Sequence, residues 1–349
     1  MAYPIWKDYY VNLGVGDSVE YRVRIDGSVI YAGKAYKRPG QSFNQIRIND
    51  ICADYLHHSL PNLGHLTFSE GEQGKTFDVL ALAGDTWTIV DSVQFIADYS
   101  YEDSVSRILS HPINGHLSPL QYLLFTTMDV ASVNVVIIKK DGSVINAAIP
   151  VAQGVSVADT GDVLGDFSLD FNVDFFNAEA DIEVTGSGIV TAVIDMAQYQ
   201  DVQRVVVNGV VYEVADGCSR YALYYVNAFG GWDSLLVEGN HSEVDNLTRH
   251  TREVDYDNRD VRNRGRQNYV NQINKALTLH TSWISDEESL RMHHLLNSTE
   301  VYLYDIAGRR MIPVMLNNTT SEYKTYKSNG CRLVNYAIEV SYANDRIRR

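Results

Sequence analysis

The most specific catalytic motif in the sequence is Asp159-Thr160-Gly161, the tripeptide of aspartic proteases. That mechanism needs two carboxylates that share one proton, so a single chain must supply a second Asp-Thr-Gly or Asp-Ser-Gly. No second copy occurs, and Asp162 stands where a Ser or Thr normally supports the site. The motif therefore does not predict a protease.

Metal and cofactor motifs are equally incomplete. Asp159, Asp162 and Asp166 offer oxygen atoms to calcium but lack the loop spacing that arranges such ligands in advance. The histidine pairs at 57–58 and 293–294 show neither HExxH nor zinc spacing, and no GxSxG, P-loop or GxGxxG is present. Glycosidase carboxylates meet only in space, so spacing neither identifies nor removes such a pair. We expect no enzyme activity, no bound metal and no cofactor.

Cys52, Cys218 and Cys331 are odd in number, far apart and in no CxxC spacing. This pattern is typical of free, buried thiols in a protein made in a reducing cytoplasm.

The segment "YYVNAFGGWDSLLVEG" (224–239) admits three interpretations: a ligand platform, a phosphate loop or the tip of a β-hairpin. A phosphate loop needs Lys-Ser/Thr at a helix start after the glycines, and none follows. The segment therefore predicts two strands, 221–228 and 232–237, that turn at Gly230 and Gly231. We expect Trp232 to pack at the seam between the second domain and the charged arm described next.

Residues 242–269 are strongly charged with few apolar residues, which predicts an exposed arm or long loop over 241–272. Its arginines are interleaved with Asp255, Asp257 and Asp260. These acidic residues reduce the positive charge that binding to nucleic acid requires, so the pattern disfavours a nucleic-acid arm. Arg–carboxylate forks between subunits fit this pattern better than a nucleic acid does. The interface candidates in this chain are Trp232, Gly230, Gly231, Arg259, Arg262, Arg264, Arg266 and Trp283.

Turn signals organise the first two thirds of the chain. "VRIDGSVIYAG" (23–33) and "IKKDGSVINAA" (138–148) share DGSVI, and Asn208-Gly209 supplies a third signal of the same kind. Such dipeptides between alternating apolar residues predict hairpins with type I′ turns. We expect a β-domain over 1–116, with a short helix capped by Asn49 or Asp50, and a β-sandwich over 117–240. Whether these two domains are duplicates or share a turn by chance stays open.

Residues 273–349 predict a further β-domain with one helix over 285–298, either separate from the arm or forming one unit with it. Ser285 and Glu288 form a capping box, and three acids lie in the first turn. A hairpin is expected over 299–316, turning at Ala307-Gly308, followed by a closing strand within 331–344. The predicted fold class is thus mainly β: antiparallel sandwiches followed by a β-domain with a flanking α-helix.

Charge is unevenly distributed. The net charge is −15, and residues 241–349 hold 16 Lys/Arg and 14 Asp/Glu, which leaves 13 and 30 for the rest. So acidic a chain is a poor general binder of nucleic acid. The asymmetry suits head-to-tail docking between subunits, and equally an ordinary acidic surface. No apolar run is long enough to span a membrane, and the first residues do not predict a secretion signal.

The C-terminal pattern carries a resemblance. "LTLHTSWISDEESLRMHHLLNSTEVYLYD" and "RRMIPVMLNNTTSEYKTYKSNGCRLVNYAIEVSYANDR" resemble structural proteins of tailed phages and prophages of Bacteroides-type bacteria, in particular the tail-tube-derived hub domains of distal tail and baseplate proteins. The resemblance covers about the last 130 residues and carries no catalytic residues. It implies a homo-oligomeric ring in the virion, assembled from chains made in the host cytoplasm and in contact with other tail proteins.

Two other function classes compete with this interpretation. A carbohydrate-binding or adhesin-like module is suggested by the tyrosine content and by four tryptophans that could stack on sugars: Trp6, Trp87, Trp232 and Trp283. A β-sandwich hydrolase has no sequence feature in its favour.

Overall fold

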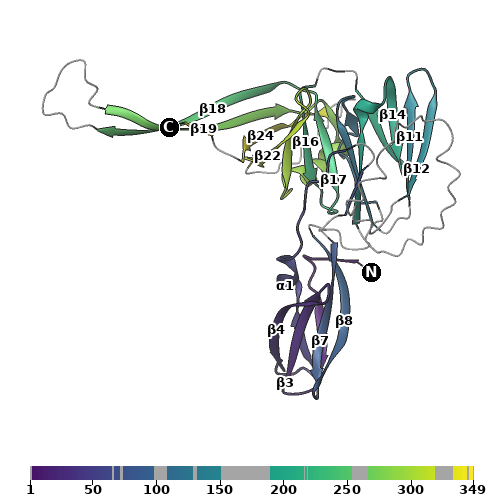
Figure 1. Ribbon diagram of the computed structural model, residues 1–349, viewed down its shortest axis with the longest axis vertical. Helices are drawn as coiled ribbons and strands as arrows, with labels where there is room; N and C mark the ends of the chain where they lie inside the picture. The colour runs from purple at the N-terminus through teal and green to yellow at the C-terminus, as the bar shows by residue number, and fades with distance from the viewer. Residues whose placement is uncertain are drawn as a thin grey trace, which may run out of the picture.

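The computed structural model describes residues 2–64, 67–70, 74–97, 108–128, 132–150, 189–215, 217, 219–253, 266–318, 333–343 and 346–348. The fold is mainly β, built from several antiparallel sheets and two α-helices. Figure 1 shows an N-terminal unit that hangs below a layered β-body, from which a long two-stranded arm projects sideways. The acidic residues Asp159, Asp162 and Asp166, for which no site was expected, lie outside the described residues, as do Cys218 and Cys331.

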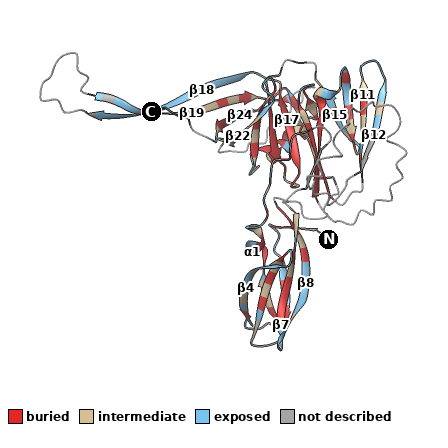
Figure 2. Cartoon of the chain, in the orientation of Figure 1, coloured by how far each residue is buried: buried red, intermediate tan, exposed pale blue. Residues whose placement is uncertain are grey.

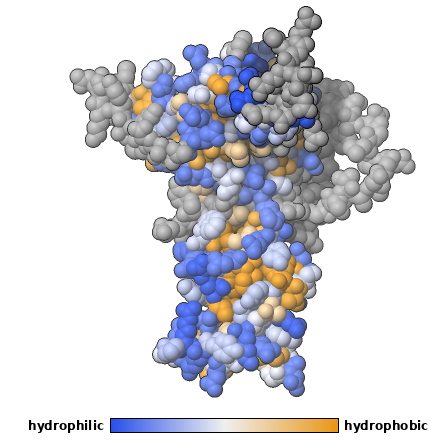
Figure 3. All heavy atoms as spheres, turned by 90° about the vertical axis from the view of Figure 1, so that its left-hand side faces the viewer, coloured by the Kyte–Doolittle hydropathy of each residue, from blue (hydrophilic) through white to orange (hydrophobic). Residues whose placement is uncertain are grey.

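The N-terminal unit packs a five-stranded sheet against a two-stranded sheet and a short helix. The larger sheet has the order β1 (Ala2–Pro4), β8 (Thr86–Ile96), β7 (Gly74–Ala83), β3 (Ser18–Ile25) and β4 (Ser28–Tyr36). The smaller sheet pairs β2 (Tyr10–Gly14) with β5 (Asn44–Arg47), and α1 (Asn49–Ala53) follows. Phe77 and Phe95 anchor the core between them, where the free Cys52 is fully buried. Figure 3 shows apolar residues that also reach the surface of this unit.

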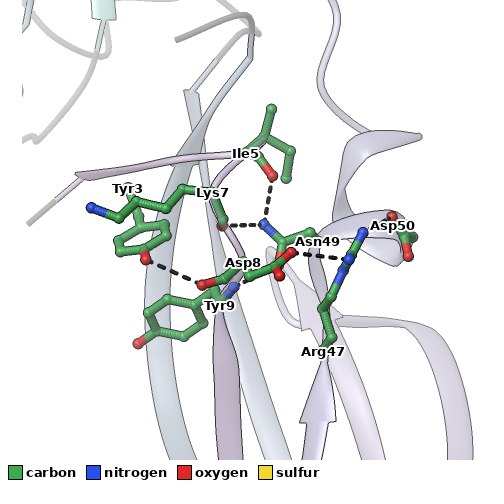
Figure 4. Close-up of polar contacts among 8 residues, drawn as sticks. All are labelled: Tyr3, Ile5, Lys7, Asp8, Tyr9, Arg47, Asn49 and Asp50. Carbon is green, nitrogen blue, oxygen red and sulfur yellow. Dashed lines mark hydrogen bonds and ion pairs between the residues drawn. The ribbon is translucent and has the colours of Figure 1, made fainter. Parts of the chain in front are cut away.

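The predicted cap at Asn49 or Asp50 is wrong. Ile48 occupies the N-cap position without a side-chain cap, and α1 ends at Ala53. The Asn49 amide instead accepts the Tyr9 N–H at 2.9 Å and donates to the carbonyls of Ile5 and Lys7 (Figure 4). The reason is that the backbone of residues 5–9 needs hydrogen-bond partners where it turns back over the core, and the Asn49 amide supplies both donor and acceptor.

The second unit is a β-sandwich of two sheets. One has the order β10 (Tyr122–Met128), β13 (Ile189–Asp195), β6 (Thr67–Glu70); the other has β12 (Val144–Pro150), β11 (Ser132–Lys139), β14 (Val202–Val207), β15 (Val210–Val214), β9 (His116–Leu117). A short 3-10 helix, η2, covers Met196–Gln198. Phe125, Ile194 and Val205 lie in the core between the sheets. Strand β6 falls within 1–116 and β9 spans the boundary itself, so the division expected at residue 116 does not follow the sheet pairing.

Two of the three predicted type I′ turns are confirmed. Asp26-Gly27 and Asn208-Gly209 both have positive φ at each residue, as this turn requires. At the third, only Gly142 has positive φ, and its N–H donates to the Lys139 carbonyl at 3.0 Å. This is a longer loop with a glycine bulge, in which the Asp141 carboxylate accepts the N–H and hydroxyl of Ser143. The shared DGSVI pentapeptide therefore adopts two different turns.

The C-terminal unit is one large sheet that curls on itself. Its order is β17 (Trp232–Val237), β16 (Tyr221–Val226), β21 (Val301–Asp305), β22 (Arg310–Leu316), β24 (Ala337–Tyr342), β19 (Arg266–His280), β18 (His241–Glu253), with β25 (Arg346–Arg348) also beside β19. Strands β17 and β18 stand at opposite ends of this order, yet only residues 238–240 join them. The end of β17 and the start of β18 therefore lie close together. In the connection between them, the Gly239 N–H donates to the carbonyl of His280, the last residue of β19, at 3.1 Å.

Helix α2 (Asp286–Leu296) flanks this curled sheet and packs Met292 and Leu295 into its core. The predicted capping box is confirmed, because Ser285 accepts the Glu288 N–H and the Glu288 carboxylate accepts the Ser285 N–H. The hairpin β21–β22 is also confirmed, and β20 (Ile284–Ser285) pairs with β23 (Leu333–Val334) beside it. Among the described residues, no helix is long and apolar enough to cross a membrane.

The three sheets of the body form layers. One face of the β10–β13 sheet packs in the sandwich core, while Leu124 and Val193 on its other face pack against Tyr224 and Trp232 of the curled sheet. Strands β16 and β17 are consequently buried on both faces (Figure 2). Their assignment to the second sandwich is wrong: β16 pairs with β21 of the C-terminal sheet. Strands that are apolar on both faces give no alternation from which to infer their sheet.

The charged arm is a β-hairpin rather than a loop. Strands β18 and β19 pair from His241–Leu279 to Glu253–Arg266, and Figures 1 and 2 show the exposed far part extending beyond the body. The boundary expected between residues 272 and 273 falls inside β19, so the arm and the C-terminal sheet share a continuous strand.

Candidate functional site: a buried joint at the tip of β16–β17

The tip of the β16–β17 hairpin lies against two segments of the chain that precede it by more than a hundred residues. Gly230 has φ +77°, and a Cβ added there would come within 2.8 Å of the Ala97 carbonyl oxygen. A Cβ on Gly231 would come within 2.5 Å of the Leu109 carbonyl oxygen. Both glycines are needed because neighbouring backbone occupies the space of a side chain.

Asn227 shapes this tip and fastens it to residues 108–111, which we call the strap. Its Oδ1 accepts the N–H groups of Phe229 at 2.8 Å and Gly231 at 3.1 Å. Its Nδ2 donates to the Leu109 carbonyl at 2.7 Å and to Asp233 Oδ2. A single buried amide therefore closes the turn and holds the strap against it.

Trp232 is buried, with 1% of its surface exposed, and its ring lies 6.0 Å from that of Tyr302. Its N–H donates to Thr126 Oγ1 at 2.9 Å, and its carbonyl accepts the Ser110 hydroxyl at 2.9 Å. The predicted packing of Trp232 against the charged arm is wrong, because its partners belong to β10, β21 and the strap. The position follows from the burial of β17 on both faces.

Asp233, the second residue of β17, carries a carboxyl group that is buried at this hairpin tip. Its Oδ2 accepts the His111 N–H at 2.9 Å and the Asn227 amide, while Oδ1 has no hydrogen-bond partner. Burial raises the pKa of Asp233 to about 7, against the opposing effect of these hydrogen bonds. We call Asn227, Trp232 and Asp233, together with the two glycines and the strap, the joint.

Two tyrosine hydroxyls share this environment. Tyr212 and Tyr225 are buried, and neither hydroxyl oxygen has a hydrogen-bond partner. Burial raises the pKa of both phenols well above the ordinary value, and the charge of Asp233 adds to the shift. Both phenols are therefore neutral, and a protonated Asp233 suits these surroundings better than a carboxylate does.

Helix α2 closes the joint from the other side. Arg291 donates to the Pro112 carbonyl at 3.0 Å, and the Phe229 ring lies between the rings of His111 and His294, 4.2 and 5.5 Å away. Burial lowers the pKa of His111, and it lowers the pKa of His294 to about 4. Both imidazoles are neutral at pH 7 and pack as rings.

The chemistry of the joint is that of a structural contact. The described residues hold no cluster of three or more His, Cys, Asp or Glu side chains that fits a metal ion. Amide, hydroxyl, carboxyl and backbone groups meet here, and their hydrogen bonds join β16–β17 to the strap and to β10. The arrangement therefore holds the hairpin, the strap and β10 together.

The predicted interface residues fall in separate places. Gly230, Gly231 and Trp232 meet in the joint, whereas Trp283 is 66% exposed beyond the end of β19. Arg266 opens β19 opposite Glu253 in the arm. Arg259, Arg262 and Arg264 lie outside the described residues.

Sequence reasoning missed Asn227, Asp233, Ser110 and Thr126. A signal for the first two was present, because they are the polar residues that flank the turn of an otherwise apolar hairpin, where polar groups are retained only if they have partners. Comparison with protein-family models and with curated proteins finds no match to this chain.

Proposed function

We propose that this chain is a non-enzymatic structural protein of the virion, a ring-forming component of a phage tail hub or baseplate. Its partners are further copies of itself and other tail proteins. The observation that carries the proposal is the β18–β19 arm, which extends away from the body that anchors it (Figure 1).

The arm exposes apolar side chains that its own chain leaves uncovered. Val244, Leu247 and Tyr269 are 52%, 51% and 52% exposed, and every described residue from His241 to Arg252 is exposed. A two-stranded hairpin with both faces in water is marginal in stability. Burial of these side chains against another molecule would stabilise it.

A second copy of the chain is the partner that fits best. Residues 241–349 carry a net charge of +2 and residues 1–240 carry −17, from 16 Lys/Arg against 14 Asp/Glu and 13 against 30. An arm from the less acidic part that lies on the acidic part of a neighbour lowers the repulsion between subunits. Because the arm and the acidic surface are on different parts of one chain, such contacts repeat head to tail, and they form a ring when the rotation between neighbours closes.

The curled sheet with its single flanking helix agrees with the hub-like domain that the C-terminal sequence resembles. The shared strand β19 makes the arm a continuous extension of that sheet, which gives contacts between subunits a base in the body.

Light scattering after size-exclusion chromatography tests the proposal, with negative-stain images of the same fractions. We expect rings from the wild type and monomers from the double variant Val244→Asp/Leu247→Asp. The control is Ile89→Asp, which places the same charge at an equally exposed apolar position on β8 and is expected to leave the rings intact. A wild type that stays monomeric at high concentration, or rings that persist in the double variant, would contradict it.

The carbohydrate-binding alternative now rests on fewer residues. Trp232 is buried, and the Arg22 guanidinium covers the Trp87 ring at 4.1 Å. Trp6 and Trp283 remain exposed.

A further inference from the structure

We infer that a groove beside Trp283, at the point where the curled sheet closes, binds a neutral saccharide. We call it the seam groove. It has a volume of about 430 Å³ and is lined by Glu238, Gly239, Asn240, His280, Trp283 and Asn335, among others. This volume lies within the range of small-molecule sites, about 300–1,000 Å³. The inference concerns ligand binding by the single chain and does not depend on ring formation.

Gly239, in the connection between β17 and β18, lines the groove. A Cβ on Gly239 would collide with the His280 carbonyl that its N–H reaches, so the two segments approach without side chains between them. A smaller hollow of about 210 Å³, which also contains Arg220 and His241, lies along the same short segment and shares Glu238 and Gly239 with the seam groove. Two neighbouring hollows therefore lie along the connection between β17 and β18.

Trp283 is held in a fixed place although its ring is exposed. Thr281, two residues earlier, is buried, and its N–H donates to the Tyr336 carbonyl at 3.0 Å while its hydroxyl accepts the Tyr336 N–H at 2.9 Å. Ile284, the next residue, is buried in the core. The backbone on both sides of Trp283 is thereby fixed, and the exposed indole offers an apolar surface on which the C–H face of a pyranose can stack.

Glu238 supplies the directional polar contact. His116 Nδ1 donates to its carboxylate at 3.0 Å, and the Ser282 hydroxyl binds it as well. The hydrogen bond from His116 lowers the pKa of Glu238, so the carboxylate is ionised and fixed in orientation. A fixed carboxylate accepts hydrogen bonds from sugar hydroxyls, and the amide of the exposed Asn240 can donate and accept beside it.

The charges of the groove favour a neutral sugar. Glu238 repels an anionic one. The same carboxylate already accepts the hydrogen bond from His116 and therefore has less capacity left for a cationic ligand. The combination of one exposed indole, one fixed acceptor and an amide fits hydroxyl groups on an uncharged ring.

Saturation-transfer NMR with defined sugars tests the inference. The probes are glucose, galactose, mannose, N-acetylglucosamine and lactose, each titrated against the wild type and against the Val244→Asp/Leu247→Asp variant. We expect saturable transfer to at least one probe in both proteins. In Trp283→Ala and in Glu238→Gln we expect the affinity to fall about tenfold or more, which corresponds to about 1.4 kcal/mol. Trp6→Ala is the matched control, since Trp6 is similarly exposed on the N-terminal unit, and it should bind as the wild type does.

Two results would overturn the inference: the lack of saturable transfer to any probe, and equal binding by Trp283→Ala and the wild type. Where the wild type binds no sugar, loss of rings in Trp283→Ala would assign the indole to a contact between subunits. Because binding is also measured in the arm variant, failure of ring formation and failure of sugar binding are read separately.

Discussion

Two hairpins that follow each other in the chain have opposite environments. The β16–β17 hairpin is buried on both faces along its whole length, and the described part of β18 is exposed along its whole length. The first is held by core packing and by hydrogen bonds to distant segments. The second is held mainly by pairing of its own strands and by contacts at its base. A β-hairpin therefore joins distant segments inside the body in one case and extends away from the body in the other.

The residues that separate the two hairpins are few. Only Glu238, Gly239 and Asn240 lie between the end of β17 and the start of β18. Within this distance the chain passes from a fully buried, mostly apolar strand to one in which charged and polar residues predominate. Burial is therefore decided by side-chain composition, because backbone pairing is equally available to both hairpins.

Replacement of Trp232 by alanine should have the largest effect on stability. The change removes a buried indole between β10, β13 and β21, and such substitutions cost about 3–5 kcal/mol. Urea denaturation of the variant and of the wild type measures the difference. Trp6→Ala should change the free energy of unfolding by no more than about 0.5 kcal/mol, since that ring is 69% exposed. A Trp232→Ala protein as stable as the control would show that the joint does not depend on the indole.

Asp233→Asn should change how stability depends on pH. The ordinary pKa of an aspartate is 3.8, and that of Asp233 is about 7, so between these values the folded protein holds a proton that the unfolded chain releases. Stability should therefore fall as pH rises through this window. An asparagine stays neutral, and its Oδ1 can accept the two donors that reach Asp233 Oδ2, so the variant lacks this loss. The effect is a few kcal/mol at most, because one pKa unit corresponds to about 1.4 kcal/mol.

The measurement is urea denaturation at pH 5 and pH 8 for both proteins. Because the pKa of His116 is raised, that group also loses stabilisation as pH rises, so only the difference between variant and wild type reports on Asp233. Asp85→Asn, at an exposed turn, should follow the wild type at both values. If the wild type and Asp233→Asn run parallel between pH 5 and pH 8, the joint does not hold a protonated carboxyl group.

Sequence reasoning predicted local features better than their placement. The Asp26-Gly27 and Asn208-Gly209 turns and the capping box of α2 were predictable because each depends on residues within a few positions. The β16–β17 hairpin was predictable for the same reason, but its sheet was not, since both faces are apolar. Asn49 was misread as a cap because its true partners lie forty residues earlier in the chain.

The arm and the joint each contain a feature that could not be predicted from the sequence. The arm was predicted to be exposed but not to be β, because charged residues on both faces of β18 hide the alternation that indicates a strand. In the joint, the contact of Gly231 with Leu109 and the bond from Ser110 to Trp232 join positions about 122 residues apart. Such pairings depend on the packing of three sheets, which no local pattern encodes.

Lys275→Ala should have the smallest effect, confined to the arm. Lys275 Nζ lies 3.7 Å from Glu243 and 4.0 Å from Asp245, across the base of the β18–β19 hairpin. Exposed pairs of this kind contribute about 0.2–1 kcal/mol and weaken as salt is added. Hydrogen exchange of amides in 241–253 should accelerate about twofold at low salt, and this difference should shrink at high salt, while the joint is unaffected.

Lys34→Ala removes a comparable exposed pair with Glu20 on the N-terminal sheet and should leave arm exchange unchanged. Arm exchange that is insensitive to Lys275 would mean that strand pairing alone orders the hairpin, and the contrast with the buried hairpin would then lie in burial and not in charge.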